Sequence, residues 1–318
     1  MGGNFQQTLP IVPKGSREDI LDTTITRSYL WHDINVIHLH QNMWLRDDPE
    51  ADSFSKWLLK IGHGENIDEN NEVEIPSDMR TTDTNSLMHF VYPNLELSSQ
   101  ANPPPANYFL QQIILAPQNS NVNVTNEILL DKMPGNTKIY YSANNIIHEP
   151  GADHHRLSFV PPEFFCSIQS PSLPPGDLKI KIGCPIILLW NLSPSKGLCN
   201  GSRMTVVNMS ERVLHIHLIG GDHDGQLALI PRICLIPTST PNFAFKFKCL
   251  QFPVRLAFVI TINKAQGQSV LYIGVDICIP VFAHSQLYVA LSRVTTKQNI
   301  KVLLPSDNTN SKTTNVLF

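Results

Sequence analysis

The sequence predicts an α/β domain with a small β-barrel inserted into it. Three observations predict this class: a strand pattern followed by a helix pattern near the middle of the chain, the return of that pattern near the end, and a run of short alternating segments between them. With 318 residues and 42% hydrophobic content, the chain can bury a core and hold one to three domains.

The first strand and helix patterns lie side by side in the sequence. FLQQIILAP (109–117) is a short apolar run that ends in proline, as in a strand buried on both faces. Residues 119–133 follow with helical spacing and with asparagine and threonine as capping candidates. A strand that leads into a helix is typical of a parallel sheet, and we assign the α/β domain to residues 107–180 and 255–304.

The α/β pattern returns after the central segment. RLAFVIT (255–261) and VLYIGVDI (270–277) have the pattern of strands on either side of a polar turn. A helix is predicted over residues 284–294, where apolar residues at i, i+3, i+4 and i+7 form one buried stripe: Leu287, Ala290, Leu291 and Val294.

Residues 181–254 have an all-β pattern. Short alternating segments such as RMTVVNM and VLHIHLIGG are separated by turn formers, among them Asn200-Gly201. About five short strands in a segment of this length suit a small barrel.

Two segments lie outside this architecture. Residues 46–106 are acidic and polar and end in ANPPPAN, whose consecutive prolines exclude helix and central strand, so we expect a helical segment followed by a linker. Residues 305–318 are rich in polar side chains, and we expect a disordered tail.

The charge is distributed unevenly along the chain. Residues 1–180 carry 11 lysines and arginines against 22 acidic residues, a net charge of −11, whereas residues 181–318 carry 13 against 5, a net charge of +8. A basic half is the electrostatic footprint of a surface that binds polyanions, although proteins that bind no nucleic acid can also have one.

Composition and spacing argue against several classes of protein. No window approaches the ~18 uninterrupted apolar residues of a membrane span, and the N-terminus lacks the regions of a signal peptide. We therefore expect a location inside the cell. The six cysteines lie 15 or more residues apart and predict reduced core thiols, and the histidines have no metal-ligand spacing, so we assign no metal.

Four segments of the sequence match known motifs. RLAFVITINKAQGQSV (255–270) and YVALSRVT (288–295) resemble the fifth and sixth motifs of superfamily 1B helicases, and QFPVRLAF before them is typical of the Pif branch. Residues 2–31 resemble the third motif and the stretch after it, and LHQNMWLR (39–46) resembles the fourth. The chain therefore resembles Pif-family (petite integration frequency) DNA helicases, of the type carried by Helitron transposons.

The resemblance implies a fold and a set of ligands. In the family, the second RecA-like domain carries a Src-homology-3-like barrel as an insertion, in agreement with the pattern above. ATP and Mg²⁺ are held mainly by GxxGTGK[ST] and an acidic pair in the first RecA-like domain, and this sequence has no Gly-Lys-Ser/Thr. We therefore expect the C-terminal part of such a helicase, with residues 1–45 as a remnant at the junction with the first domain.

The resemblance also implies roles at the nucleotide. Arg293 matches the arginine finger, an exposed side chain that would reach across the domain cleft to the γ-phosphate; the alternative is a solvated arginine on an amphipathic helix. Gln7 matches the third-motif glutamine that senses this phosphate. Gln266 and Gly267 match positions at the nucleotide cleft, and Gly267 would allow a tight turn.

For DNA, the fifth motif implies contacts from Thr261, Lys264 and Ser269, with an ordinary polar helix start as the alternative. The barrel adds four candidates: Asn200, Arg203, Lys246 and Lys248. Three phenylalanines alternate beside the two lysines, either as platforms on which bases stack or as core side chains: Phe243, Phe245 and Phe247.

Three positions depart from the family pattern. Asn4 stands where the family usually has aspartate, Trp44 replaces the fourth-motif arginine, and Asn263 stands where many relatives have histidine. Arg46 lies two residues beyond Trp44, about 200° around a helix, so it cannot take the place of that arginine. The departures suggest a decayed copy.

The function that we expect is that of the C-terminal part of an ATP-dependent 5′ to 3′ DNA helicase in DNA repair, recombination or telomere maintenance, inactive alone. Its expected partners are single-stranded DNA and a complementary helicase domain, with no membrane. The alternatives are a non-enzymatic module that binds single-stranded nucleic acid and an inert truncated transposon product.

Overall fold

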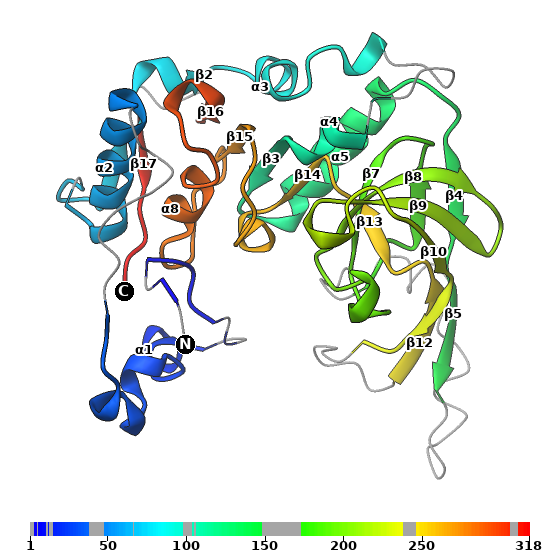
Figure 1. Cartoon of the computed structure of the whole chain (residues 1–318), viewed down its shortest axis with the longest axis horizontal. Helices are drawn as coiled ribbons and strands as arrows, with labels where there is room; N and C mark the ends of the chain where they lie inside the picture. Colours follow the sequence, from blue (N-terminus) through cyan, green and yellow to red (C-terminus); the bar gives the residue numbers. More distant parts are fainter. Residues whose placement is uncertain are drawn as a thin grey trace. The chain divides into compact units, whose positions relative to one another are not determined.

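The computed structural model describes residues 3–4, 6–10, 12, 15–37, 48–65, 67–97, 104, 106–147, 173–237, 246–305 and 311–318 (Figure 1). The chain divides into two compact units. One comprises Met1–Pro93, Gln111–Val122 and Ile260–Phe318, and the other comprises Asn94–Leu110 and Asn123–Val259. None of the helices in the described ranges is both long enough and apolar enough to cross a membrane.

The first unit is built on a five-stranded sheet in the order β14-β3-β15-β16-β2. The strands are β14 (Val259–Thr261), β3 (Gln112–Ala116), β15 (Tyr272–Asp276), β16 (Ile300–Leu303) and β2 (Arg80–Thr81). β15 pairs in parallel with β3 and β16, and β16 pairs in parallel with β2. All five residues of β3 are buried, as the apolar run predicts, and the expected parallel α/β class is confirmed.

Helices pack on this sheet and on one another. α3 (Thr84–Val91) lies on β15, where a methyl group added at Gly274 would be 2.9 Å from a methyl group of Val91, so the close approach requires glycine. α2 (Pro49–His63) packs against α8 (Gln286–Leu291) (Figure 1). The predicted apolar stripe on α8 is buried. The helix is shorter than the predicted range of residues 284–294, and all six of its residues are buried.

The acidic segment is more structured than expected. The predicted helix is present as α2, but the residues after it form β1 (Glu72–Glu74), β2 and α3 rather than a linker. Buried apolar side chains are interspersed with the charges, so the polar composition conceals a folded segment: Val73, Ile75, Met79, Leu87 and Val91.

The prediction of a disordered tail is wrong for residues 311–318. β17 (Lys312–Thr314) pairs antiparallel with β1, and the Asn315 side chain, 2% exposed, donates to the Ile61 carbonyl at the end of α2 at 3.0 Å. The Val316 carbonyl accepts from the Ser285 amide, just before α8, at 2.8 Å. Strand pairing and side-chain hydrogen bonds order this polar segment, and composition does not reveal either of them.

The second unit is antiparallel β-structure. Its strands between residues 185 and 251 lie where the alternating segments predict them, whereas its strands between residues 138 and 180 lie in the part that the sequence assigned to the α/β domain, so that assignment is wrong for residues 123–180. One sheet has the order β10-β9-β8-β7-β13, a second the order β11-β12-β5, and a third pairs β4 with β6. Closure of these sheets into a barrel stays a prediction. The elements are α4 (Ala106–Leu110), β4 (Lys138–Tyr141), β5 (Ala143–Ile147), β6 (Asp177–Ile180), β7 (Pro185–Leu188), β8 (Arg203–Met209), β9 (Val213–Ile219), β10 (Leu227–Pro231), β11 (Ile233–Leu235), β12 (Lys246–Gln251) and β13 (Val254–Leu256).

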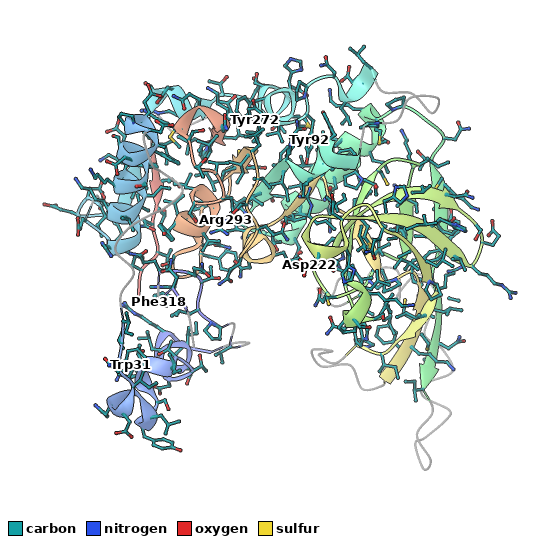
Figure 2. The ribbon with its side chains drawn as sticks, viewed as in Figure 1. Trp31, Tyr92, Asp222, Tyr272, Arg293 and Phe318 are labelled. Atoms are coloured by element: carbon teal, nitrogen blue, oxygen red, sulfur yellow. The ribbon has the colours of Figure 1, made fainter. Side chains whose placement is uncertain are left out.

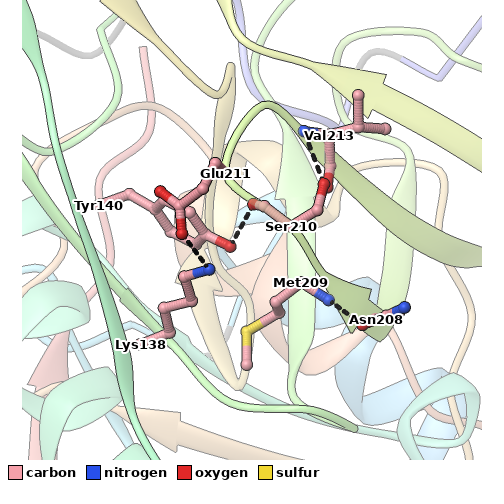
Figure 3. A network of polar contacts seen from close by, with 7 residues as sticks. All are labelled: Lys138, Tyr140, Asn208, Met209, Ser210, Glu211 and Val213. Atoms are coloured by element: carbon pink, nitrogen blue, oxygen red, sulfur yellow. Dashed lines mark hydrogen bonds and ion pairs between the residues drawn. The ribbon is translucent and has the colours of Figure 1, made fainter.

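A polar network joins β4 to the turn between β8 and β9 (Figure 3). Lys138 forms an ion pair with Glu211 at 2.7 Å, and the Tyr140 hydroxyl donates to the Ser210 carbonyl at 2.7 Å. The Lys138 ammonium also lies 5.0 Å from the centre of the Tyr140 ring. Glu211 is exposed, so we assign most of the stabilisation to the tyrosine hydrogen bond and little to the ion pair.

The predicted strand over residues 255–261 is divided between two sheets. Its first part belongs to β13 and its last part to β14, which is held by α5 (Asn119–Lys132). The Asn126 side chain, 3% exposed, accepts from the Val259 amide at 3.0 Å and donates to the Val259 carbonyl at 2.8 Å. Both polar groups of one strand residue are therefore paired with one side chain.

Asn126→Leu should lower the free energy of unfolding by about 2–4 kcal/mol, because two backbone groups in a buried position lose this partner while the volume is nearly kept. Urea denaturation measures the effect. Asn123→Leu, at an exposed position of the same helix, is the control and should change stability by less than about 0.5 kcal/mol. Equal stability of the two variants would contradict the assignment.

Candidate functional site

The candidate site lies in the first unit, where β14 ends. Thr261 precedes the short helix η8 (Ile262–Ala265), and a polar turn leads from η8 toward β15. Gly267 has a φ of 78°, the left-handed conformation that the predicted tight turn needs. Gln266, Gly267 and Ser269 are exposed, whereas Thr261 and Lys264 are half-buried.

Two residues predicted from separate motifs meet at this turn. Gln266 donates from Nε2 to Oε1 of Gln7 at 2.7 Å, and its own Oε1 accepts from the Thr8 hydroxyl at 2.9 Å. Gln6 lies within hydrogen-bond distance of His63 at the end of α2, at 2.6 Å. The segment that resembles the third motif is thus held beside the segment that resembles the fifth.

Arg293, labelled in Figure 2, lies in the turn after α8 and is buried. The side chain is 8% exposed: Nε donates to the Val289 carbonyl at 2.8 Å, Nη1 to the Gln268 carbonyl at 3.1 Å and Nη2 to the Ser292 hydroxyl at 2.8 Å. Burial lowers the pKa of the Arg293 guanidinium. The expectation of an exposed arginine is therefore wrong for this structure, because carbonyl and hydroxyl oxygens of its own unit pair the cation.

Only some of the residues predicted to bind DNA are exposed in the second unit. Arg203 is 6% exposed and donates to the Phe109 carbonyl at 2.6 Å, so it fastens α4 to β8 and is not a surface cation, which corrects its assignment to DNA. Asn200 and Lys248 are exposed. Phe247 is buried with Leu235 and others in a core cluster, in agreement with the core alternative.

Some predicted positions fall outside the described residues. These are Phe243, Phe245, Trp44, Arg46 and the side chain of Lys246. Asn4 is described, and its side chain accepts from the Gln6 amide at 2.9 Å.

The structure also changes the electrostatic expectation. Four cations of the basic half donate to backbone carbonyls from buried or half-buried positions: Lys181, Arg203, Arg255 and Arg293. Lys297 and Lys312 form ion pairs with Asp78 and Asp68, each at 2.7 Å. The surface available to a polyanion is therefore less basic than the net charge of +8 suggests.

The residues present do not by themselves fit ATP and Mg²⁺. The sequence has no phosphate-binding Gly-Lys-Ser/Thr, and within the described ranges no three histidine, cysteine, aspartate or glutamate side chains gather as a metal site. Arg293, which is 8% exposed, can reach a phosphate only after turning away from the oxygens above.

The sequence motifs did not predict a link between η8 and α8. Gln286, 1% exposed, donates from Nε2 to Oδ1 of Asn263 at 3.1 Å. The available signal was a polar residue at the start of an otherwise apolar helix, where a buried amide needs partners.

Comparison of the sequence with known proteins matches two segments. Residues 1–72 match the family of PIF1-like helicases, and residues 163–209 match the 2B domain of DNA helicase Pif1. ATP-dependent DNA helicase PIF7 of Trypanosoma brucei brucei is 31% identical over 162 residues, which cover 42% of this chain and 16% of that protein. ATP-dependent DNA helicase Pif1 of Campylobacter jejuni is 32% identical over 134 residues, which cover 40% and 29%.

Comparison of the structure gives the fold. The crystal structure of Pif1 helicase from Candida albicans superposes with a TM-score of 0.57 at 19% identity, over 97% of this chain and 64% of that chain. Bacteroides Pif1 bound to single-stranded DNA superposes with a TM-score of 0.59 at 20% identity, over 94% and 60%. The fold of the first unit, with its parallel sheet, is therefore RecA-like. The chain is similar to Pif1-like helicases, of which it spans only part of the length.

Arg293→Ala should lower the free energy of unfolding by about 1–3 kcal/mol, because the Gln268 carbonyl loses a buried partner with a charge. Chemical denaturation followed by circular dichroism measures this. The stability of Arg293→Lys should lie between that of the natural chain and that of Arg293→Ala, since a lysine can reach fewer of the three oxygens. Arg212→Ala, at an exposed position, is the control. If both alanine variants are equally stable, the guanidinium does not hold the turn.

Proposed function

We propose that the chain is the part of a Pif1-type ATP-dependent 5′ to 3′ DNA helicase that contains the second RecA-like domain, of the Helitron transposon type. The observation that supports this most is the likeness to solved Pif1 structures over 94–97% of the chain, together with the two matching segments. We also propose that this helicase acts in DNA repair, recombination or telomere maintenance, in the nucleus or alternatively in the mitochondrion.

In this role Arg293 supplies positive charge to the γ-phosphate of a nucleotide held by another domain. The guanidinium must first exchange its bonds to Gln268 and Ser292 for phosphate oxygens. Since the sequence offers no phosphate cradle of its own, we propose that this polypeptide alone does not hydrolyse ATP.

A complementary helicase domain is the proposed protein partner. No residue is buried in α1 (Arg17–Asp22), η1 (Ile25–Arg27) or η2 (Tyr29–Asp33). Six apolar side chains between residues 25 and 37 are 38–83% exposed: Ile25, Tyr29, Leu30, Ile34, Val36 and Ile37. Apolar surface of this extent supports a docking role for the segment.

Single-stranded DNA is the proposed nucleic-acid partner. In the first unit Thr261, Lys264 and Ser269 would contact phosphates, and in the second unit Asn200 and Lys248 would do so. A non-enzymatic single-strand binder is the second candidate, favoured by the absence of a phosphate cradle from the sequence. An inert transposon product would bind neither a nucleotide nor single-stranded DNA.

The test is fluorescence anisotropy with labelled oligo(dT) across a salt series. The two lysines among these residues, Lys264 and Lys248, predict a slope of log K against log salt of about −1.4, at about 0.7 per neutralised phosphate on single strands. Lys248→Gln and Lys264→Gln should each make the slope less steep by about 0.7. Lys56→Gln, an exposed lysine on α2, should leave the slope unchanged. Absence of binding at low salt would leave only the inert product.

A further inference from the structure

α8 is fastened at both ends to the turn that follows β14. At its start, Gln286 is bonded to Asn263 at 3.1 Å. At its end, the Arg293 carbonyl accepts from the Val270 amide at 3.0 Å, and the Arg293 guanidinium donates to the Gln268 carbonyl. Two separate attachments fix both the position and the direction of the helix relative to residues 262–270.

The attachment at the start of α8 is specific in its chemistry. Oε1 of Gln286 accepts from the Phe282 amide at 3.1 Å and the Ala283 amide at 3.4 Å, so its Nε2 must be the atom that faces Asn263. Asn263 must then present an acceptor. Aspartate can supply that oxygen, and alanine cannot.

Asn263 also lies next to the residues proposed to touch DNA. Lys264 is adjacent in sequence and Thr261 is two residues before, all within or beside η8. The hydrogen bond between Asn263 and Gln286 therefore joins this segment directly to the start of α8.

We propose that Asn263 and Gln286 are positioning residues that transmit the binding of single-stranded DNA at η8 to α8 and Arg293. This inference rests on the proposed function and adds the path within the site. α8 is wholly buried, so it moves as a body when one end is pulled. Arg293, which follows it, then moves against the Gln268 carbonyl that holds the guanidinium inward.

Hydrogen–deuterium exchange of the full chain, with and without oligo(dT), tests the path. Without DNA, Asn263→Ala should speed exchange of the Val289 and Ser292 amides in and after α8 by about tenfold, since the start of the helix loses its buried bond. In Asn263→Asp, the exchange rates of these amides should stay within about threefold of those in the natural chain. Asn85→Ala, at an exposed position of α3, is the control.

With DNA, the natural chain and Asn263→Asp should show altered exchange in both residues 262–270 and α8, whereas Asn263→Ala should show it only in residues 262–270. A response of α8 in Asn263→Ala equal to that in the natural chain overturns the inference. So does unchanged exchange of α8 in Asn263→Ala without DNA. If DNA alters the exchange of residues 262–270 but not of α8 in the natural chain, the proposed path is overturned, while the proposed DNA binding is kept. No response anywhere, with no binding by anisotropy, overturns both.

Discussion

Burying a polar group costs free energy unless it is paired inside the protein, and this constraint sets the arrangement around α8. The helix has no solvent-exposed face. The side-chain amide of Gln286 therefore donates to the Asn263 side chain, and the guanidinium of Arg293 donates to the Gln268 carbonyl. Asn126 does the same for Val259 at the start of β14. These bonds connect segments that are far apart in the sequence and define where the candidate site lies.

The pairing also explains why net charge is a poor guide to the surface. Arginine and lysine side chains carry long stems that can be buried, and their charged ends reach carbonyl oxygens at 2.5–2.6 Å in the second unit, as at Lys181 and Arg203. A cation used in this way holds the fold together and is withdrawn from any polyanion. The remaining positive surface is smaller, and the expected salt dependence is correspondingly modest.

Periodicity predicted the parts of the fold in which apolar side chains dominate. β3, α5 and the buried stripe of α8 followed from apolar runs and spacing, and so did the antiparallel strands of the second unit. The folded part of the acidic segment and β17 were not predicted, since their order comes from a few buried apolar residues and from pairing with β1. At the site, the motifs assigned Gln7 and Gln266 separately to the nucleotide, and only the structure shows that their side chains are hydrogen-bonded to each other. Likewise, no sequence pattern shows that the Gln268 carbonyl accepts from Arg293 and holds it inward.

In the proposed function, Arg293 contacts the phosphate of a nucleotide bound by another domain. The most direct measurement is ATP turnover by this chain fused to a first RecA-like domain from a related Pif1 helicase, with Trp44→Arg also made. The fusion should hydrolyse ATP, and Arg293→Lys should lower kcat by roughly 10³-fold or more with little change in KM, since lysine lacks the planar donors of the guanidinium. Undiminished turnover by the Arg293→Lys fusion would contradict the account and leave Arg293 with a purely structural role.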